Sequence, residues 1–461
     1  MENDFIKLSQ LFEASKSSSL EEKLFNIAGW IATNRNNGQV GFISIYDGST
    51  FKNVQVVYDE KKISNYAEVA KLNVGACISV KGELILTPNN KQPFEINANE
   101  ITLLGAVAED FPLQKKAHSF EFLRDLAHLR PKANTFKAVF RVRNCLSMAI
   151  HNFFQENGFM YVHTPILTSN DCEGAGETFK VCTGKNNSNS EFFGKNVYLT
   201  VSGQLHVEPF ALAYGNVYTF GPTFRAENSN TKTHASEFWM IEPEMAFCDL
   251  NKDMEVIEKC IKYCIKYVLD KCPDELEFFN SFIDKTLKTR LTDVLSKEFK
   301  KIDYADAVKT LQDDIKNSKV TFKENDVHFG TDFGTEHERY ITEKIVGGPV
   351  FIYNFPKEMK SFYMRNNDDG RTVAAADLLL PQVGELVGAS QREERYDVLK
   401  QKMEEVGNMN GLEWYLETRK YGCCYHSGFG IGFERFLMYV TGMENIRDVE
   451  PYPRTSNQIK Y

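Results

Sequence analysis

The chain has 461 residues, of which 42% are hydrophobic and 25% charged, and its formal net charge is −9. This composition is typical of a globular protein with two or three domains. It excludes a membrane-spanning protein, because no stretch approaches the roughly 18 consecutive apolar residues of a transmembrane helix. The negative net charge also excludes a protein whose whole surface binds nucleic acids without specificity. A local basic groove would nevertheless suffice for binding RNA.

The start of the chain and its cysteines indicate the compartment. The first residues, MENDFIKLSQ, have neither the basic nor the apolar region of a signal peptide. The ten cysteines form no CxxC pair, and Cys260 and Cys264 lie one helical turn apart in an apolar pattern, where buried thiols are ordinary. We therefore expect a cytoplasmic protein with reduced cysteines, no zinc site and no membrane association.

After a polar lead-in with a short helix, five short alternating runs follow between residues 24 and 105. They read LFNIAGWIATNR, VGFISIYDG, FKNVQVVY, ACISVKGELIL and FEINANEITLLG. Five strands in about eighty residues predict a small closed barrel of the OB type. Such barrels commonly stack single-stranded bases on aromatic residues. Phe42 could be a stacking platform, although its spacing alone favours a core residue.

The residues from 111 to 135, with Pro112 and Pro131, are expected to form a hinge. Apolar residues then recur at helical spacing from Phe136 to Phe153, and Asn157-Gly158 ends the predicted amphipathic helix. The run GFMYVHTPIL predicts a strand, which its proline should keep at the edge of a sheet. The next loop, NDCEGAGETF, could close over a pocket, and VYLTVSGQLH predicts a further strand.

Two alternating runs, VYTF and EFWMIEPEMAF, predict a hairpin with a long polar loop. At strand spacing Arg225 and Glu227 share one face, and so do Phe238, Glu242 and Glu244. Charges gathered on one sheet face need a ligand or a network, since they are rarely buried unpaired. The alternative is a solvated strand face with a salt-bridged arginine.

The remainder of the chain predicts helices and a sheet. From about 250 to 325 the residues are charged and helical, which we interpret as an insertion covering the sheet. PVFIYNFP, SFYMRN and TVAAADLLL predict antiparallel strands. Asp377 and Glu385 are expected at opposing strand ends, where two carboxylates could hold Mg²⁺ on triphosphate oxygens or could be exposed turn acids. In HSGFGIGFERFLMYVTG, Glu434-Arg435 begins a helix after glycines that allow close approach to a ligand.

Three of these segments resemble the signature motifs of class II aminoacyl-tRNA synthetases. FRAENSNTKTHASEFWMIEPE is similar to motif 2, in particular that of asparaginyl-tRNA synthetases, the helix and proline-containing strand resemble motif 1, and GFGIGFER resembles motif 3. The resemblance implies an α+β fold: an OB-type anticodon-binding barrel in residues 1–110, a hinge in 111–135 and a catalytic antiparallel sheet flanked by helices in 136–461. It also implies a homodimer, because motif 1 packs against its twin.

The resemblance further implies ATP, L-asparagine and tRNA(Asn) as substrates and Mg²⁺ as cofactor. ATP would be bound by Arg225, Glu227, His234, Phe238, Glu385 and Arg435. Of these, Arg225, Arg435 and Glu385 would be catalytic. Asparagine would be bound by Glu173, Ser202, Gln204, Glu227, Glu242 and Arg392. The metal ligands would be Asp377 and Glu385, and the anticodon would be held by Phe42 and Gln55. Whether Glu227 binds the asparagine amide or the adenine amino group stays open.

Three positions bear on how closely the chain follows that family. Ala389 stands where a second glycine is expected, and Glu450 where an apolar residue is usual. Val207 occupies the position at which aspartyl enzymes have a lysine that pairs with the substrate carboxylate, which favours asparagine. The alternatives are an aspartyl-tRNA synthetase, an ammonia-using asparagine synthetase, and an RNA-binding or signalling protein with an inactive site.

Overall fold

The first five strands close into a barrel in the order β1-β2-β3-β5-β4, as predicted. The computed structural model describes residues 5–16, 24–90, 92–170, 177–182 and 190–461, in two compact units of residues 1–138 and 139–461. The barrel strands are β1 (Leu24–Asn36), β2 (Val40–Tyr46), β3 (Val54–Asp59), β4 (Cys77–Leu86) and β5 (Phe94–Gly105).

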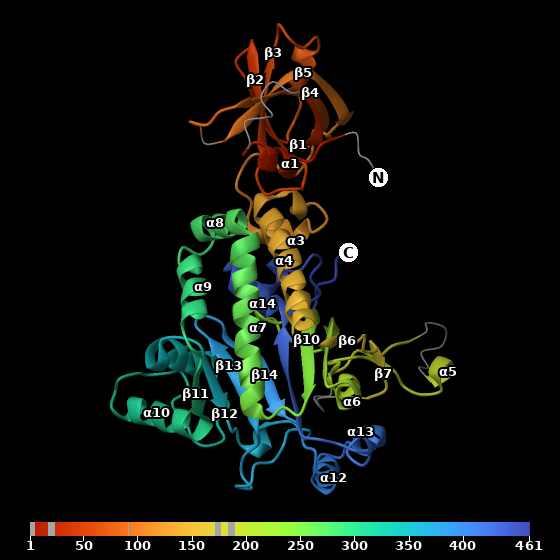
Figure 1. Cartoon of the computed structure of the whole chain (residues 1–461), viewed down its shortest axis with the longest axis vertical. Coiled ribbons are helices and arrows are strands. Elements are labelled where there is room, and N and C mark those ends of the chain that lie inside the picture. The colour runs from red at the N-terminus through yellow and green to blue at the C-terminus, as the bar shows by residue number, and fades with distance from the viewer. Residues whose placement is uncertain (1–4, 17–23, 91, 171–176, 183–189) are drawn as a thin grey trace. The chain divides into compact units, whose positions relative to one another are not determined.

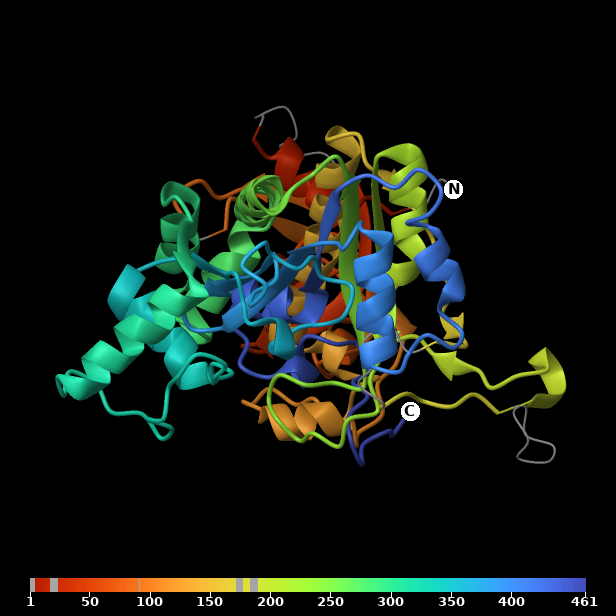
Figure 2. The same ribbon diagram turned by 90° about the horizontal axis from the view of Figure 1, so that it is seen from below.

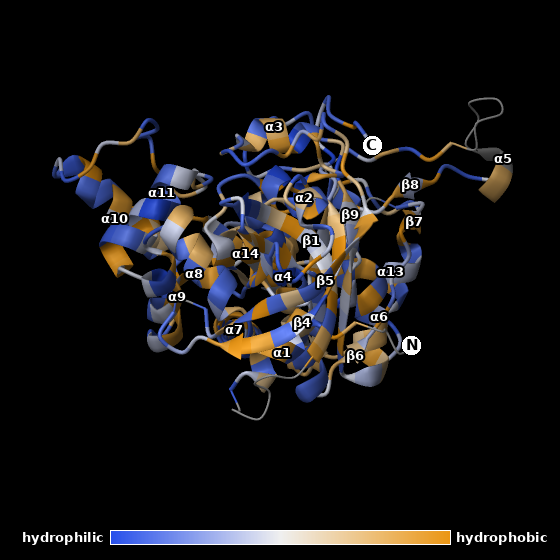
Figure 3. Cartoon of the chain, turned by 90° about the horizontal axis from the view of Figure 1, so that it is seen from above, coloured by the Kyte–Doolittle hydropathy of each residue, from blue (hydrophilic) through white to orange (hydrophobic). Residues whose placement is uncertain are grey.

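Alternation along the strands builds the core of the barrel. Orange and blue segments follow one another along β4 (Figure 3), and the inward-facing side chains, such as Ile43, Ile45 and Val56, are fully buried. The short helix α1 (Leu8–Ala14) adds Leu8 and Leu11 to this core. The described residues of this unit also form the helices α2 (Tyr66–Val69), α3 (Phe120–Asp125) and the 3-10 helix η2 (Arg130–Lys132).

The second unit is organised by an eight-stranded sheet in the order β11-β12-β13-β14-β15-β10-β9-β6 (Figure 1). Neighbouring strands in this sheet are antiparallel, except for the parallel pairs β11·β12 and β6·β9 at its two edges. The strands are β6 (Met160–Tyr161), β9 (Asn216–Phe224), β10 (Glu237–Ala246), β11 (Lys300–Asp303), β12 (Val350–Tyr353), β13 (Ala375–Leu380), β14 (Gly384–Gln391) and β15 (His426–Gly432). Strands β7 (Leu167–Thr168) and β8 (Tyr198–Leu199) form a separate pair.

Helix α7 (Leu250–Lys271) covers one face of this sheet, against β13, β14 and β15. Its apolar residues recur at helical spacing, and Asp249 caps its first turn by accepting from the amide of Lys252. Helix α10 (Tyr304–Lys316) packs beside strands β11 and β12 at the edge of the sheet (Figure 2). The other helices are α4 (Asn134–Glu156), α5 (Ser190–Phe193), α6 (Gln204–Tyr214), α8 (Pro273–Phe282), α9 (Leu287–Ser296), α10 (Tyr304–Lys316), α11 (Thr335–Tyr340), the π-helix η3 (Ile341–Val346), η4 (Lys357–Met359), α12 (Tyr396–Glu405), α13 (Glu413–Glu417), α14 (Phe433–Thr441) and η5 (Ile446–Asp448).

The hairpin β9-β10 and helix α14 form as predicted, but several local predictions are wrong. Of GFMYVHTPIL, Met160–Tyr161 forms the edge strand β6 and Leu167 begins β7, whereas the residues between them, including Pro165, are not in a strand. Gln204 begins a helix instead of lying on a strand with Ser202. SFYMRN forms no regular strand and contributes only two isolated bridges, between Met364 and Arg392 and between Asn366 and Val373. The segment 250–325 is mainly helical, but it also adds strand β11 to the sheet.

Candidate active site

One cavity of about 400 Å³ opens over the sheet of the second unit. Every site residue that the sequence predicts in this unit, apart from Glu173, lines it. Glu173 lies outside the described residues. The predicted site residues in the lining are Ser202, Gln204, Arg225, Glu227, His234, Phe238, Glu242, Asp377, Glu385, Arg392 and Arg435. Side chains separated by more than 200 positions in the sequence therefore share one site.

Cations gather at one end of the cavity. Arg225 follows the last residue of β9, and its guanidinium carbon lies 5.5 Å from the ring centre of Phe238 on β10. Arg435, in the first turn of α14, donates to the backbone oxygen of Glu385 at 3.3 Å. Burial, reinforced by Arg435, lowers the pKa of His234 from its ordinary value, although Glu227 opposes this. The two guanidinium groups create a positive region beside an aromatic ring, a setting suited to a polyphosphate joined to a base.

The long loop between β9 and β10 is fastened by the C-terminal segment. The amide of Ile446 donates to the oxygen of Lys232 at 2.8 Å, and the Arg447 side chain donates to the oxygen of Thr231 at 3.0 Å. At the end of the loop, the amide of Ser236 donates to the oxygen of Arg454 at 2.7 Å. The loop that carries His234 is thereby held over the cavity.

Two carboxylates face each other across Gly388. Asp377 lies in the middle of β13, not at a strand end as expected, and pairs with Gly388 of β14. Glu385 is three residues before Gly388, so a regular strand would turn it to the opposite face, but the register shift in this ladder returns it to the cavity. A methyl group on Gly388 would contact both carboxylates, at 3.6 Å from Glu385 Oε1 and 3.8 Å from Asp377 Oδ1.

Negative charge is in excess around this pair. The low-dielectric surroundings of the cavity wall and the charge of Asp377 raise the pKa of Glu385 above its ordinary value. Burial and the charges of Glu385 and Asp377 also raise the pKa of Glu338 to about 7. Lys360 Nζ contacts Asp377 Oδ2 at 2.6 Å and supplies a single compensating charge. Within the described residues no group of three or more side chains forms a metal site by itself, so a cation here would need oxygens from a ligand as well.

The opposite end of the cavity is a polar pocket built on α6 and β10. Glu242 accepts from the hydroxyl of Ser202 and from the amide of Gly203, the latter at 2.9 Å. Gln204, the next residue, donates its side-chain amide to Glu208 at 3.1 Å. An ammonium or amide group could be bound among these oxygens, because carboxylates offer acceptors only.

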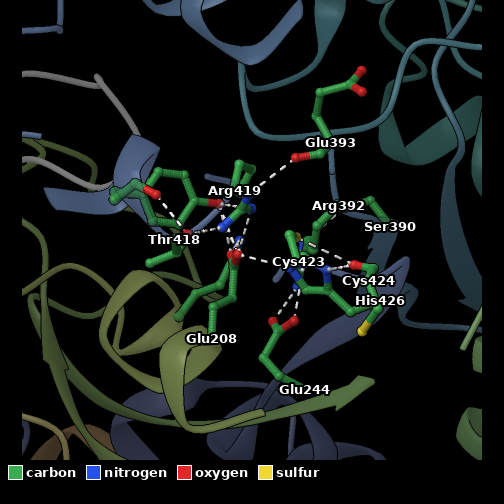
Figure 4. A network of polar contacts seen from close by, with 12 residues as sticks. Glu208, Glu244, Ser390, Arg392, Glu393, Thr418, Arg419, Cys423, Cys424 and His426 are labelled. Atoms are coloured by element: carbon green, nitrogen blue, oxygen red, sulfur yellow. Dashed lines mark hydrogen bonds and ion pairs between the residues drawn. The ribbon is translucent and has the colours of Figure 1, made fainter. Parts of the chain in front are cut away.

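Arg392 lines the cavity and belongs to a buried network of polar contacts (Figure 4). Its Nε and Nη2 both donate to the carboxylate of Glu244, at 3.1 and 2.5 Å, and its Nη1 donates to Ser390 Oγ at 2.7 Å. Burial opposes the charged form, but the paired carboxylate of Glu244 raises the pKa of Arg392 well above its ordinary range. All three nitrogens of this arginine are therefore engaged by the protein.

The structure places Ala389, Glu450 and Val207, the three positions compared with the family, in different surroundings. Ala389 is a buried residue of β14 that lines the cavity, not a residue of a turn. Glu450 is buried, as an apolar residue at that position would be. Val207 packs in a small core with Val162 and Val217, not in the cavity lining.

Sequence reasoning missed Lys360, Glu338 and the network around Glu208. Lys360 and Glu338 sit in segments without a recognisable pattern. Glu208 is contacted by Arg419, which is 211 positions away. Its location immediately after the SGQLHV run was the one local signal.

Phe42 and Gln55 lie on the barrel, in the first of the two units. Phe42 is partly exposed between the buried residues Gly41 and Ile43, so it faces outward and the expectation of a core residue is wrong. Its cross-strand neighbours are Arg35 and Val57. Gln55 also faces outward, and its amide donates to Glu95 at 3.0 Å. The outer face thus carries an aromatic ring with polar groups in adjacent strands.

No helix in the described part of the chain has the length and apolar character needed to cross a membrane. Residues 119–456 match the family model of class II tRNA synthetases (D, K and N), and residues 25–104 match that of the OB-fold nucleic acid binding domain.

Curated relatives cover almost the whole chain. The asparagine–tRNA ligase of Clostridium perfringens strain 13 is 55% identical over 470 residues, covering 99% of this chain and 100% of the relative. That of Clostridium tetani is 56% identical over 456 residues, covering 95% and 97%. Among solved structures, asparaginyl-tRNA synthetase from Pyrococcus horikoshii complexed with asparaginyl-adenylate is 31% identical, with a TM-score of 0.87 and 100% of both chains covered.

Proposed function

Since the chain belongs to the class II tRNA synthetases of the aspartyl, lysyl and asparaginyl group, we propose that it is an asparagine–tRNA ligase. It activates L-asparagine with ATP and transfers the asparaginyl group to the 3′ end of tRNA(Asn). The observation that carries this proposal is the single cavity with cations and an aromatic ring at one end and a carboxylate-lined polar pocket at the other.

In the first step the α-carboxylate of asparagine attacks the α-phosphate of ATP, so that asparaginyl-adenylate forms and pyrophosphate leaves. Arg225 binds the α-phosphate, Arg435 the γ-phosphate, and Phe238 stacks on adenine. His234 and Glu227 complete the nucleotide site. Preorganised cations stabilise the negative charge that develops on the phosphoryl and leaving oxygens, and no enzyme nucleophile is needed.

In the second step a ribose hydroxyl of the tRNA attacks the carbonyl carbon of the adenylate, and AMP leaves. Asparagine is held by Ser202, Gln204, Glu242 and Arg392, with Glu173 from the preceding loop. The oxygens of Glu242 suit the α-amino group, which carries only donors.

The carboxylates of Asp377 and Glu385 fit a magnesium ion bound together with the triphosphate. Both are hard oxygen ligands, and the pKa of Glu385 is raised by removal from water and by the charge of Asp377, both of which a bound cation would offset. A bound Mg²⁺ would neutralise charge on the triphosphate oxygens. Lys360 keeps Asp377 oriented by their ion pair.

The barrel serves as the anticodon-binding domain, with Phe42 stacking on a base and Gln55 bonding to it. The proposed domains remain 1–110 for the barrel, 111–135 for the hinge and 136–461 for catalysis. Because its substrate is tRNA for protein synthesis, we place the enzyme in the cytoplasm.

A homodimer formed through motif 1 is part of the proposal. The short edge strand β6 and the segment after it expose apolar side chains: Met160 is 44%, Ile166 41% and Leu167 44% exposed. Exposed apolar residues at a sheet edge suit a symmetric contact with a second copy, which buries both edges at once.

The rival within the family is an aspartyl enzyme, and the ammonia-using ligase is a more distant one. Incubation with ATP, asparagine and tRNA should yield asparaginyl-tRNA, AMP and pyrophosphate, without any requirement for ammonia. Formation of aspartyl-tRNA at a comparable rate would favour the aspartyl rival, and conversion of aspartate and ammonia to asparagine without tRNA charging would refute the proposal.

A further inference from the structure

Glu208 is the junction of a buried network behind the amino-acid pocket. Its side chain has no exposed surface. Its carboxylate accepts from Gln204 Nε2 at 3.1 Å, from Tyr415 OH at 2.8 Å, from Arg419 Nη2 at 2.7 Å and from His426 Nε2 at 3.1 Å. Burial would raise the pKa of this carboxyl, but Arg419 and His426 hold it well below its usual range. Glu208 is therefore a fixed negative charge inside the protein.

This charge sets the orientation of Gln204. The two residues lie one turn apart on α6, so their side chains meet on one face of the helix. A carboxylate only accepts hydrogen bonds, and Gln204 must therefore turn its NH₂ group toward Glu208. The carbonyl oxygen of Gln204 is then the end of the amide that can serve a ligand in the cavity. That oxygen accepts from an N–H donor and offers nothing to a carboxylate.

The same charge acts on Arg392. Burial disfavours the charged guanidinium, but Glu244 and, more weakly, Glu208 raise the pKa of Arg392. The backbones of the two groups are also linked, because the backbone amide of Arg392 donates to the backbone oxygen of His426, a ligand of Glu208, at 2.8 Å. The Arg392 cation is thus already compensated by two carboxylates, and it offers little net positive charge to a third.

Arg419 anchors this arrangement to the rest of the unit (Figure 4). Its Nε donates to the oxygen of Glu393 at 3.0 Å and its Nη1 to Thr418 Oγ1 at 2.7 Å. Every nitrogen of the guanidinium is thereby used, and Glu208 is held by a side chain that cannot easily move.

We propose that Glu208 is a positioning residue that makes the pocket select a neutral side-chain amide over a carboxylate. It does so by turning the acceptor end of Gln204 toward the ligand and by compensating the charge of Arg392. The inference rests on the proposed placement of Gln204 in the asparagine pocket. Aspartate would be rejected by the like charge and by the acceptor oxygen of Gln204, to which it offers no donor. Such effects can distinguish two substrates of nearly equal shape, as asparagine and aspartate are.

The test is amino-acid-dependent pyrophosphate exchange with Glu208→Gln, which keeps the shape of the side chain and removes its charge. We expect the KM for asparagine to rise about tenfold or more, as on loss of a hydrogen bond to a charged group. We also expect the asparagine-to-aspartate ratio of kcat/KM to fall by about tenfold or more, whereas the KM for ATP stays unchanged. The matched control is Tyr415→Phe, which removes one donor and keeps the charge, and which should leave the ratio unchanged.

Because Glu208→Gln leaves Arg419 buried without its partner, the double variant Glu208→Gln with Arg419→Gln removes both charges and is measured alongside. An unchanged asparagine-to-aspartate ratio in the folded single or double variant would overturn the inference. So would a fall in the ratio of equal size in Tyr415→Phe. The variant Gln204→Ala tests separately whether Gln204 contacts asparagine. An unchanged KM for asparagine in this variant would show that Gln204 lies outside the asparagine pocket and would overturn the inference. The proposed ligase reaction would not be affected by that result.

Discussion

The excess of negative charge around Glu385 predicts a pH-dependent stability that one substitution removes. The carboxyl of Glu338 is packed against Gly384 and accepts from the amide of Glu385 at 3.3 Å. Burial and the neighbouring charges of Glu385 and Asp377 raise its pKa from 4.5 to about 7. The folded protein therefore holds this proton more tightly than the unfolded chain does.

The sign and size of the effect of Glu338 on the free energy of unfolding follow from this difference in pKa. The stabilising contribution of Glu338 is fully present below about pH 4.5 and is lost as the pH rises through about 7. The separation of the two pKa values corresponds to about 3 kcal/mol at most. In Glu338→Gln the group stays neutral at every pH. Relative to the parent, this variant should gain up to about 3 kcal/mol of unfolding free energy between pH 5 and pH 8.

The assay is urea unfolding at a series of pH values. The chain has three tryptophans, and in a Trp30→Phe background the remaining Trp239 and Trp414 both lie in the catalytic unit, so their fluorescence follows that unit alone. Glu358→Gln, which removes an exposed carboxyl, is the control and should parallel the parent. A difference between Glu338→Gln and the parent that stays constant from pH 5 to pH 8 would refute the reasoning.

Other predictions address the proposed roles. Arg225→Ala or Arg435→Ala should remove about 3 kcal/mol of transition-state stabilisation in pyrophosphate exchange, and near-parental adenylate formation by a folded variant would contradict their roles. Phe42→Ala should weaken tRNA charging by about 1 to 3 kcal/mol and leave pyrophosphate exchange intact, whereas loss of both activities would make Phe42 a structural residue. Glu227→Gln should narrow the preference for asparagine over aspartate in the same exchange assay, and an unchanged ratio would assign Glu227 to the adenine. Sedimentation at micromolar concentration should give a dimer, and a monomer alone would contradict the motif 1 contact.

The barrel and the hairpin could be predicted because their information is local. Alternation of apolar and polar residues specifies which face of each strand is buried, so all five barrel strands follow from the sequence. The recognised motifs likewise place Arg225 and Arg435 in one site, and both line the cavity.

The remainder depended on tertiary context. Gln204 lies in an apolar run that fits strand or helix, and the structure resolves it as the first residue of a helix. The side chain of Glu385 points toward the cavity because of a register shift between β13 and β14, and no residue pattern in the sequence predicts that shift. The network around Glu208 joins residues up to 218 positions apart, and such pairings cannot be inferred from spacing.

The central claim is that this chain activates asparagine and rejects aspartate. The most direct measurement is ATP–pyrophosphate exchange with each of the two amino acids under the same conditions, compared by kcat/KM. We expect a preference for asparagine of about 10⁴-fold or more, since a buried like charge or an unmatched polar group supplies discrimination of that order. Exchange with aspartate as fast as with asparagine would contradict it.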